Sequence, residues 1–136
     1  EFRSPFAVEQ LRELSLLQAG LRRIEDIHGL ERCTGLRELN LHMNEISVIS
    51  GLDVLANSLT SLNLSSNRIR RIEGLERLSR LTSLDLSSNE VRADSPRLAV
   101  QLRLFCRSQR SAGCNASTRS SASRSPTIRL RRCTVR

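Results

Sequence analysis

The sequence contains no lysine, tryptophan or tyrosine, and its aromatic residues are limited to three phenylalanines. Large aromatic side chains supply much of the buried apolar area of an ordinary protein core. Without them, a core has to be assembled from many small aliphatic contacts. Repeat proteins are built in this way, because each unit buries one layer of side chains against its neighbours. The composition therefore favours a repeat architecture.

Long apolar runs and paired cysteines are also missing. No stretch approaches the ~18 apolar residues of a membrane-spanning helix, and the first residues show no apolar run followed by a cleavage site. The cysteines lack C-x-x-C pairs and the spacings of zinc ligands; they are Cys33, Cys106, Cys114 and Cys133. We expect no disulfide framework, no metal site and no membrane attachment, and we predict a cytoplasmic, reducing location.

The net charge of +8 is distributed unevenly along the chain. Residues 1–96 hold 12 arginines and 14 acidic residues, a balance of −2, whereas residues 97–136 hold 10 arginines and no acidic residue. The basic character therefore belongs to the C-terminal part. It says nothing about the partners of the preceding residues.

The main positive feature is a repeated leucine pattern, seen most fully in residues 59–78, L-T-S-L-N-L-S-S-N-R-I-R-R-I-E-G-L-E-R-L. Its apolar residues are spaced by two and then by about three positions, as expected for a short strand followed by a turn and a returning segment. The pattern starts at Leu36, Leu59 and Leu81, which are 23 and 22 residues apart. This regular internal repetition predicts a repeat array.

The two ends of the array are less regular than its middle. The repeat that begins at Leu81 keeps the pattern to Val91 and is broken before Pro96. Residues 14–35 form an irregular, lengthened first repeat, whose two halves fit the pattern two or three residues out of phase. We predict about 3.5 repeats within residues 14–95.

These residues resemble the leucine-rich repeat family, and within it the 22-residue cytosolic class written L-x-x-L-x-L-x-x-N-x-I-x-x-I-x-G-L-x-x-L. The resemblance covers residues 14 to about 91. It implies an α/β-type repeat solenoid, a short right-handed arc with a parallel sheet on its concave side. The class includes regulators of type-1 protein phosphatase, a spliceosomal ribonucleoprotein subunit, dynein-associated light chains, and ciliary or centrosomal assembly factors.

Each L-x-L unit is expected to form a short parallel strand with its leucines turned into the core. Asn44, Asn67 and Asn89 follow these strands. We expect them to stack as a ladder whose amides bond backbone groups of adjacent turns. We interpret the three asparagines as structural residues. Cys33 stands where other repeats have leucine, so we expect it to be a small core residue.

The outward strand residues form the predicted partner-binding surface on the concave face, in three columns with Arg68 at the edge. These columns are Glu38, Ser61 and Ser83; Asn40, Asn63 and Asp85; and His42, Ser65 and Ser87. Binding hot spots favour Trp, Tyr and Arg, and only Arg68 and Met43 offer anchors here. The competing interpretation is a solvated face without a strong partner. The lack of aromatic anchors on this polar face weakens the phosphatase-regulator interpretation most.

Catalytic and cofactor motifs are not indicated. The two histidines, His28 and His42, are 14 residues apart and belong to different turns. The sequence shows no Ser-His-Asp arrangement, G-x-G-x-x-G motif or P-loop. We predict a monomeric protein without enzyme activity, cofactor or metal.

The remaining residues flank the array. Residues 1–13 are predicted as an N-terminal helical cap, in which Phe6 and Val8 cover the first repeat, or alternatively as a polar leader. Residues 96–106 are a candidate C-terminal cap, and the Ser/Arg-rich residues 107–136 are predicted to be disordered.

Three interpretations of this Ser/Arg-rich tail stay open: a tether for nucleic acid or an acidic partner, a phosphorylation target, or the end of an incomplete gene model. The sequence as a whole predicts an adaptor that binds another protein, with a role in cilium, flagellum or centrosome assembly. The alternatives are a spliceosomal-type, RNA-associated nuclear protein that uses the tail, and a regulatory subunit of type-1 protein phosphatase.

Overall fold

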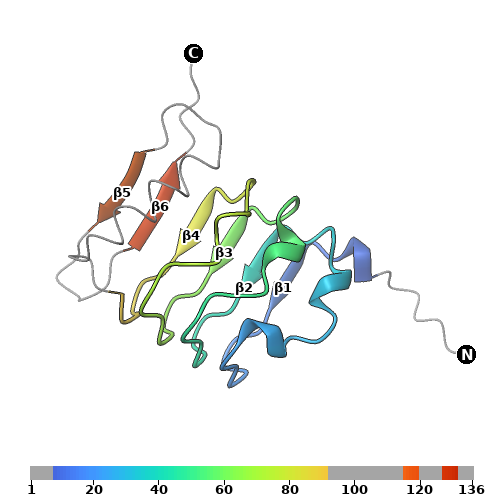
Figure 1. The fold of residues 1–136 in the computed structure, drawn as a ribbon, viewed down its shortest axis with the longest axis horizontal. Helices are drawn as coiled ribbons and strands as arrows, with labels where there is room; N and C mark the ends of the chain where they lie inside the picture. Colours follow the sequence, from blue (N-terminus) through green and yellow to red (C-terminus); the bar gives the residue numbers. More distant parts are fainter. Residues whose placement is uncertain (1–7, 92–114, 120–126, 132–136) are drawn as a thin grey trace, which may run out of the picture.

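A computed structural model describes residues 8–91, 115–119 and 127–131 of the chain. Its main feature is a four-stranded parallel sheet in which each strand pairs with the next along the chain (Figure 1). The strands are β1 (Glu13–Ser15), β2 (Glu38–Asn40), β3 (Ser61–Asn63) and β4 (Ser83–Asp85). The L-x-L units therefore form neighbouring parallel strands, as the resemblance to the leucine-rich repeat family implies.

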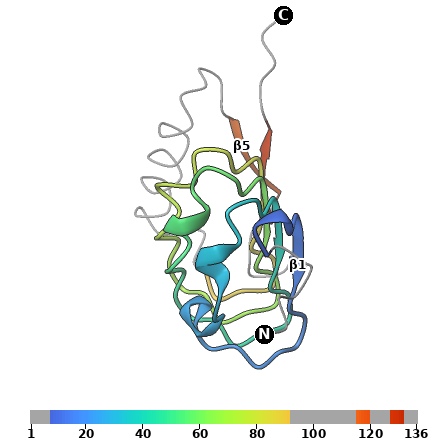
Figure 2. The same ribbon diagram turned by 90° about the vertical axis from the view of Figure 1, so that its right-hand side faces the viewer.

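The segments that return from one strand to the next form a second layer behind the sheet (Figure 2). They contain short 3-10 turns, η2 (Ile24–Asp26), η3 (Leu30–Arg32) and η4 (Asp53–Leu55), and a further turn, η1 (Val8–Gln10), precedes β1. Gly74 adopts a positive φ of 73° within one such segment, and a Cβ there would collide with the carbonyl oxygen of Ile49. Glycine is required because both the backbone angle and the space exclude a side chain.

The core lies between the two layers and is almost entirely aliphatic. The central strand leucines Leu39, Leu62 and Leu84 are each 1% exposed, and the repeating apolar positions from Leu36 to Val91 are all buried. Cys33 is buried among them, as expected for a small core residue. Burial raises the pKa of its thiol, since the thiolate is poorly solvated there, and the nearby Glu31 carboxylate acts in the same direction.

The structure resolves the phase of the first repeat. Leu14 pairs with Leu39, so the residue equivalent to Leu36 is Leu11, and the first repeat begins three residues earlier than the predicted residue 14. It is 25 residues long, from Leu11 to Gly35, which agrees with the prediction of a lengthened unit. Of the predicted N-terminal cap, the described part is the η1 turn followed by the beginning of β1; residues 1–7 lie outside the described residues.

Two strands occur within the region predicted to be disordered. β5 (Asn115–Arg119) and β6 (Thr127–Arg131) form an antiparallel pair, and β6 lies beside β4 (Figure 1). Residues 127–131 read T-I-R-L-R, a period-two alternation typical of strands. The disorder prediction rested on composition; for the two described segments alone, the structure has strands instead. The candidate cap at 96–106 and the other residues of 107–136 lie outside the described residues, so those predictions remain predictions.

Across the described parts of the chain, every helix is too short and too polar to cross a membrane.

Candidate functional site

The outward side of the sheet is the surface on which the predicted binding residues meet. We call it the open sheet face and define it by the outward residues of the four strands and of the positions that follow them. In β2 the central leucine is buried while Glu38 is exposed and Asn40 is half-buried. The same alternation recurs in β3 and β4, because successive strand residues point to opposite sides.

Strand pairing assembles the predicted columns. Glu38 aligns with Ser61 and then with Ser83, while Asn40 aligns with Asn63 and then with Asp85. β1 extends the two columns by Glu13 and Ser15, which the sequence interpretation left out. The open sheet face therefore spans four strands in register, and its role in partner binding remains a prediction.

The side chains of the second column, Asn40, Asn63 and Asp85, also form hydrogen bonds with the backbone that follows each strand. The Oδ1 atoms of its members accept hydrogen bonds from the backbone N–H two residues later: His42 N to Asn40 at 3.1 Å, Ser65 N to Asn63 at 2.9 Å, and Ser87 N to Asp85 at 2.9 Å. Such bonds turn the chain out of the strand. One oxygen of each side chain is thereby occupied, which leaves the Asn amide groups and the second Asp85 oxygen for a partner.

Ser65 is not the exposed residue that the pattern predicted. It is only 6% exposed, because its hydroxyl lies between Asn63 Oδ1 at 2.6 Å and the His42 ring nitrogen Nδ1 at 2.7 Å. His42 reaches across from the neighbouring repeat and covers it. The third column is therefore closed at its centre by a side-chain network.

This network selects the tautomer of the His42 ring. Asn63 Oδ1 accepts the Ser65 backbone N–H, so it is the amide oxygen, and the Ser65 hydroxyl donates its proton to it. The hydroxyl oxygen is then the acceptor for His42, which places a proton on Nδ1 of the ring. A nucleophilic serine needs the reverse arrangement, in which the histidine accepts the hydroxyl proton. This pair is consequently organised as a structural network.

The asparagine ladder lies under the turn that follows each strand. Asn67 accepts the backbone N–H of Ile46 at 3.0 Å and donates to the carbonyl oxygens of Leu41 at 2.9 Å and Leu64 at 3.0 Å. Asn44 and Asn89 make equivalent bonds to their own neighbours. Each amide thus joins two adjacent repeats and holds the scaffold of the open sheet face.

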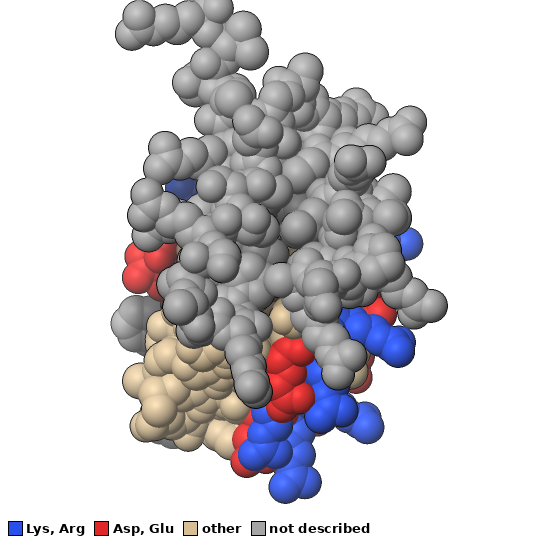
Figure 3. Space-filling model, turned by 90° about the vertical axis from the view of Figure 1, so that its left-hand side faces the viewer, with Lys and Arg blue, Asp and Glu red and all other residues tan. Residues whose placement is uncertain are grey.

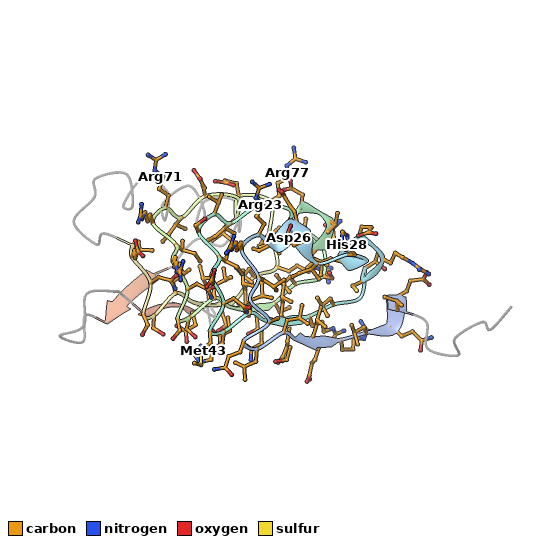
Figure 4. All side chains as sticks on the ribbon, turned by 90° about the horizontal axis from the view of Figure 1, so that it is seen from below. Arg23, Asp26, His28, Met43, Arg71 and Arg77 are labelled. Atoms are coloured by element: carbon orange, nitrogen blue, oxygen red, sulfur yellow. The ribbon has the colours of Figure 1, made fainter. Side chains whose placement is uncertain are left out.

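Two exposed apolar residues occur at the first-repeat end of the open sheet face. Leu17 is 52% exposed and Met43 is 44% exposed, and the Gln18 side-chain amide contacts the Met43 sulfur at 3.6 Å. Figure 4 shows Met43 on the sheet side of the molecule, opposite Arg23 and Arg71 on the returning segments. The sequence interpretation missed Leu17 because the phase of the first repeat was unresolved. Leu14 and Leu16 point inward, so Leu17 follows Ser15 on the outward side of the same alternation.

Arg68, predicted as an edge residue of the binding surface, is engaged in an ion-pair chain. Glu45 accepts both Arg68 and Arg22 at 3.3 Å, and Arg70 pairs with Glu90 at 2.7 Å. Figure 3 shows that acidic and basic side chains adjoin one another at the β4 end of the molecule. These pairs are exposed, so each contributes about 0–1 kcal/mol, and they leave Arg68 partly neutralised.

The described residues contain no candidate metal-binding site, because no group of three or more His, Cys, Asp or Glu side chains converges among them.

Comparison with known families agrees with this geometry. Residues 57–97, which include β3 and β4, match the family described as leucine rich repeats, in two copies. This stretch belongs to the leucine-rich repeat family. Leucine-rich repeat domains generally mediate protein–protein interaction and are typically non-catalytic. Comparison with curated proteins gives no match.

Proposed function

We propose that the protein is a non-catalytic adaptor that binds another protein across the open sheet face. The observation that carries this proposal is the register of the four strands, which aligns the outward residues of successive repeats into one accessible surface. The asparagine ladder supports the surface from beneath with buried bonds between repeats. Rigid elements of this kind position a binding surface with little loss of conformational entropy on association.

The distribution of side chains suggests where the partner is held most strongly. The apolar surface of the face is concentrated at Leu17 and Met43, next to the half-buried His42. The remaining outward positions are serine, asparagine and acidic residues. Interface hot spots are well-packed anchors surrounded by weaker polar contacts. We therefore expect the apolar anchor at the first-repeat end and hydrogen-bonded contacts along β2 to β4.

Photo-crosslinking tests the location of the interface. A photoreactive residue is placed at Ser61, in the middle of the open sheet face, or at Ser47, which is exposed on a returning segment. Both replace serine, so the two proteins differ only in the face that carries the probe. We expect one protein to be crosslinked from position 61 in cell extract and not from position 47. Equal crosslinking from both positions would contradict the proposal.

The cellular setting that we propose follows from the resemblance to the cytosolic repeat class. It is the cytoplasm, with a role in cilium, flagellum or centrosome assembly, and it is tested by imaging the tagged chain together with markers of these structures. A diffuse signal with no enrichment at either structure would argue against this setting.

RNA association through the C-terminal part is a second candidate, favoured by the 10 arginines and absent acids of residues 97–136. Binding of the full chain to single-stranded RNA should then weaken steeply as salt rises, because phosphate contacts release counterions. No measurable affinity at low salt would remove this candidate and leave the adaptor proposal unaffected.

A further inference from the structure

The His42 ring presents one nitrogen atom, Nε2, to the open sheet face. Both hydrogen bonds of the ring in the described part of the chain use Nδ1, which lies 2.7 Å from Ser65 Oγ and 3.1 Å from the Ser65 carbonyl oxygen. A carbonyl oxygen only accepts hydrogen bonds, so Nδ1 carries the proton and Nε2 of the neutral ring is an acceptor. Among the described residues, no buried side-chain nitrogen or oxygen lacks a partner. Nε2 has no partner within the protein, so it is open to solvent.

The position of this acceptor is fixed before a partner binds. His42 is half-buried, and the bonds from Nδ1 to Ser65 hold its ring against the neighbouring repeat. Ser65 is only 6% exposed and donates in turn to Asn63 Oδ1 at 2.6 Å. On the other side, the Gln18 backbone N–H donates to the His42 carbonyl oxygen at 3.3 Å. A side chain that is already ordered loses little conformational freedom when it forms one further bond.

The open sheet face carries acidic side chains and no basic ones. Its outward positions hold three carboxylates, Glu13, Glu38 and Asp85, and neither arginine nor lysine. The ion pairs found among the described residues include none of these three. Arg12 and Arg37 directly precede two of them, but alternation turns consecutive strand residues to opposite sides. The charge of the face therefore complements a cationic partner.

An apolar surface adjoins the His42 acceptor. Met43 follows His42 and is 44% exposed, and Leu17 of the first repeat is 52% exposed. The Gln18 side-chain amide contacts the Met43 sulfur at 3.6 Å. Lysine and arginine side chains combine an aliphatic stem, which packs on apolar surface, with a cationic head that donates hydrogen bonds. A side chain of this type matches both features.

We infer that the partner presents a lysine or arginine whose N–H donates to His42 Nε2 and whose aliphatic stem packs against Met43. This inference rests on the proposed function, because it names the chemistry of the partner that the open sheet face accepts. A cationic donor to a neutral acceptor forms a charge-assisted bond, which is shorter and stronger than a neutral one. A partner with a carboxylate at this point has no donor for Nε2 and meets a face that is already acidic.

Two substitutions separate the acceptor from the network beneath it. The amide of His42→Asn ends at the position of Nδ1, so it can still donate to Ser65, but no group remains at the position of Nε2. The amide of His42→Gln reaches the position of Nε2 and keeps an acceptor there, while the bond to Ser65 is lost. We expect His42→Asn to keep the parent's urea midpoint and to bind a basic probe about tenfold more weakly, the low end for a hydrogen bond to a charged group. His42→Gln should show the reverse, with a lowered urea midpoint and an affinity close to the parent's.

The probes are short synthetic peptides, one alternating arginine with leucine and a matched one alternating glutamate with leucine. Each is titrated into the nitrogen-15-labelled full chain while the His42 Nε2 signal is followed by NMR. We expect the arginine peptide to shift this signal and the glutamate peptide to leave it unchanged. Equal shifts from both peptides, or a parent-like affinity of His42→Asn for the arginine peptide, would overturn the inference.

The absence of a shift with either peptide would overturn the inference as well. A His42 signal that moves with salt before any peptide is added would then identify the chain's own arginines, in residues 97–136, as the occupant of the face. The titration needs no cellular partner. Its failure is therefore distinguishable from failure of the proposed function, which is judged by crosslinking from position 61.

Discussion

Removal of the central ladder amide, Asn67→Ala, should destabilise the array strongly although it removes no apolar contact. Asn67 is 7% exposed and lies between the second and third strands' turns. Its carbonyl oxygen is the acceptor for the Ile46 N–H at 3.0 Å, and its NH₂ group donates to the carbonyls of Leu41 and Leu64.

The loss of stability expected for Asn67→Ala depends on which backbone groups keep a hydrogen-bond partner in the variant. The Leu41 carbonyl also accepts from Asn44, and the Leu64 carbonyl also accepts from Asn89, so both remain bonded. The Ile46 N–H is left buried without an acceptor, which costs about 1–3 kcal/mol. The variant also loses the net free energy of the hydrogen bonds that the Asn67 NH₂ group donates, which brings the expected destabilisation to about 2–4 kcal/mol. This is a large share of the 5–15 kcal/mol typical of a domain.

Asn67→Asp sharpens the test because it preserves shape and the acceptor for Ile46. It replaces the NH₂ group by an oxygen that faces the carbonyl oxygens of Leu41, Leu64 and Ser65, at distances of 2.9 to 3.2 Å in the parent. A buried carboxylate against carbonyl oxygens is unfavourable. We expect Asn67→Asp to be at least as destabilising as Asn67→Ala at neutral pH, and less so at acidic pH, where the protonated acid donates one bond.

Urea denaturation followed by circular dichroism measures both variants against the parent protein. A free energy of unfolding within about 0.5 kcal/mol of the parent for Asn67→Ala, the range of neutral surface substitutions, would refute the ladder as a main source of cohesion between repeats. So would an Asp variant as stable as the parent at pH 7.

Three further predictions concern packing, backbone and protonation. Leu64→Ala, at a fully buried position, should lower the free energy of unfolding by about 2–5 kcal/mol, whereas Val48→Ala, at a position 47% exposed, should change it little; equal effects would place Leu64 outside the core. Gly74→Ala should cost more than Gly20→Ala in the same assay, because both have positive φ but only Gly74 adds a collision with a carbonyl oxygen; equal losses would contradict that geometry. Nitrogen-15 NMR should show the neutral His42 ring protonated at Nδ1, and a ring protonated mainly at Nε2 would contradict the network with Ser65.

The leucine spacing was sufficient to predict the repeats and the core, and the resemblance to the leucine-rich repeat family implied the parallel sheet. Parallel strands stack in register only if the apolar period is kept, so Leu39, Leu62 and Leu84 had to align. The same reasoning identified Cys33 as a core residue, because its position in the repeat is otherwise leucine. The spacing of the apolar residues therefore predicts the repeats and the residues of their core.

The first repeat and the details of the face could not be obtained from spacing alone. Two or three additional residues shift the phase between its halves, and only strand pairing shows that Leu14 matches Leu39. That pairing places Leu17 on the open sheet face. Ser65 was misplaced because its burial depends on the His42 side chain of the adjacent repeat, a contact between residues 23 positions apart that a one-dimensional pattern does not contain.

The adaptor proposal is tested most directly by the affinity of the crosslinked partner for two matched variants. Ser61→Arg places a long cation in the middle of the open sheet face, and Ser47→Arg places the same residue on a returning segment. By calorimetry, we predict that Ser61→Arg weakens binding at least tenfold, about 1.4 kcal/mol, while Ser47→Arg binds like the parent and both unfold at the parent's urea midpoint. Parent-like affinity of Ser61→Arg, together with weakened binding by Ser47→Arg, would contradict the account.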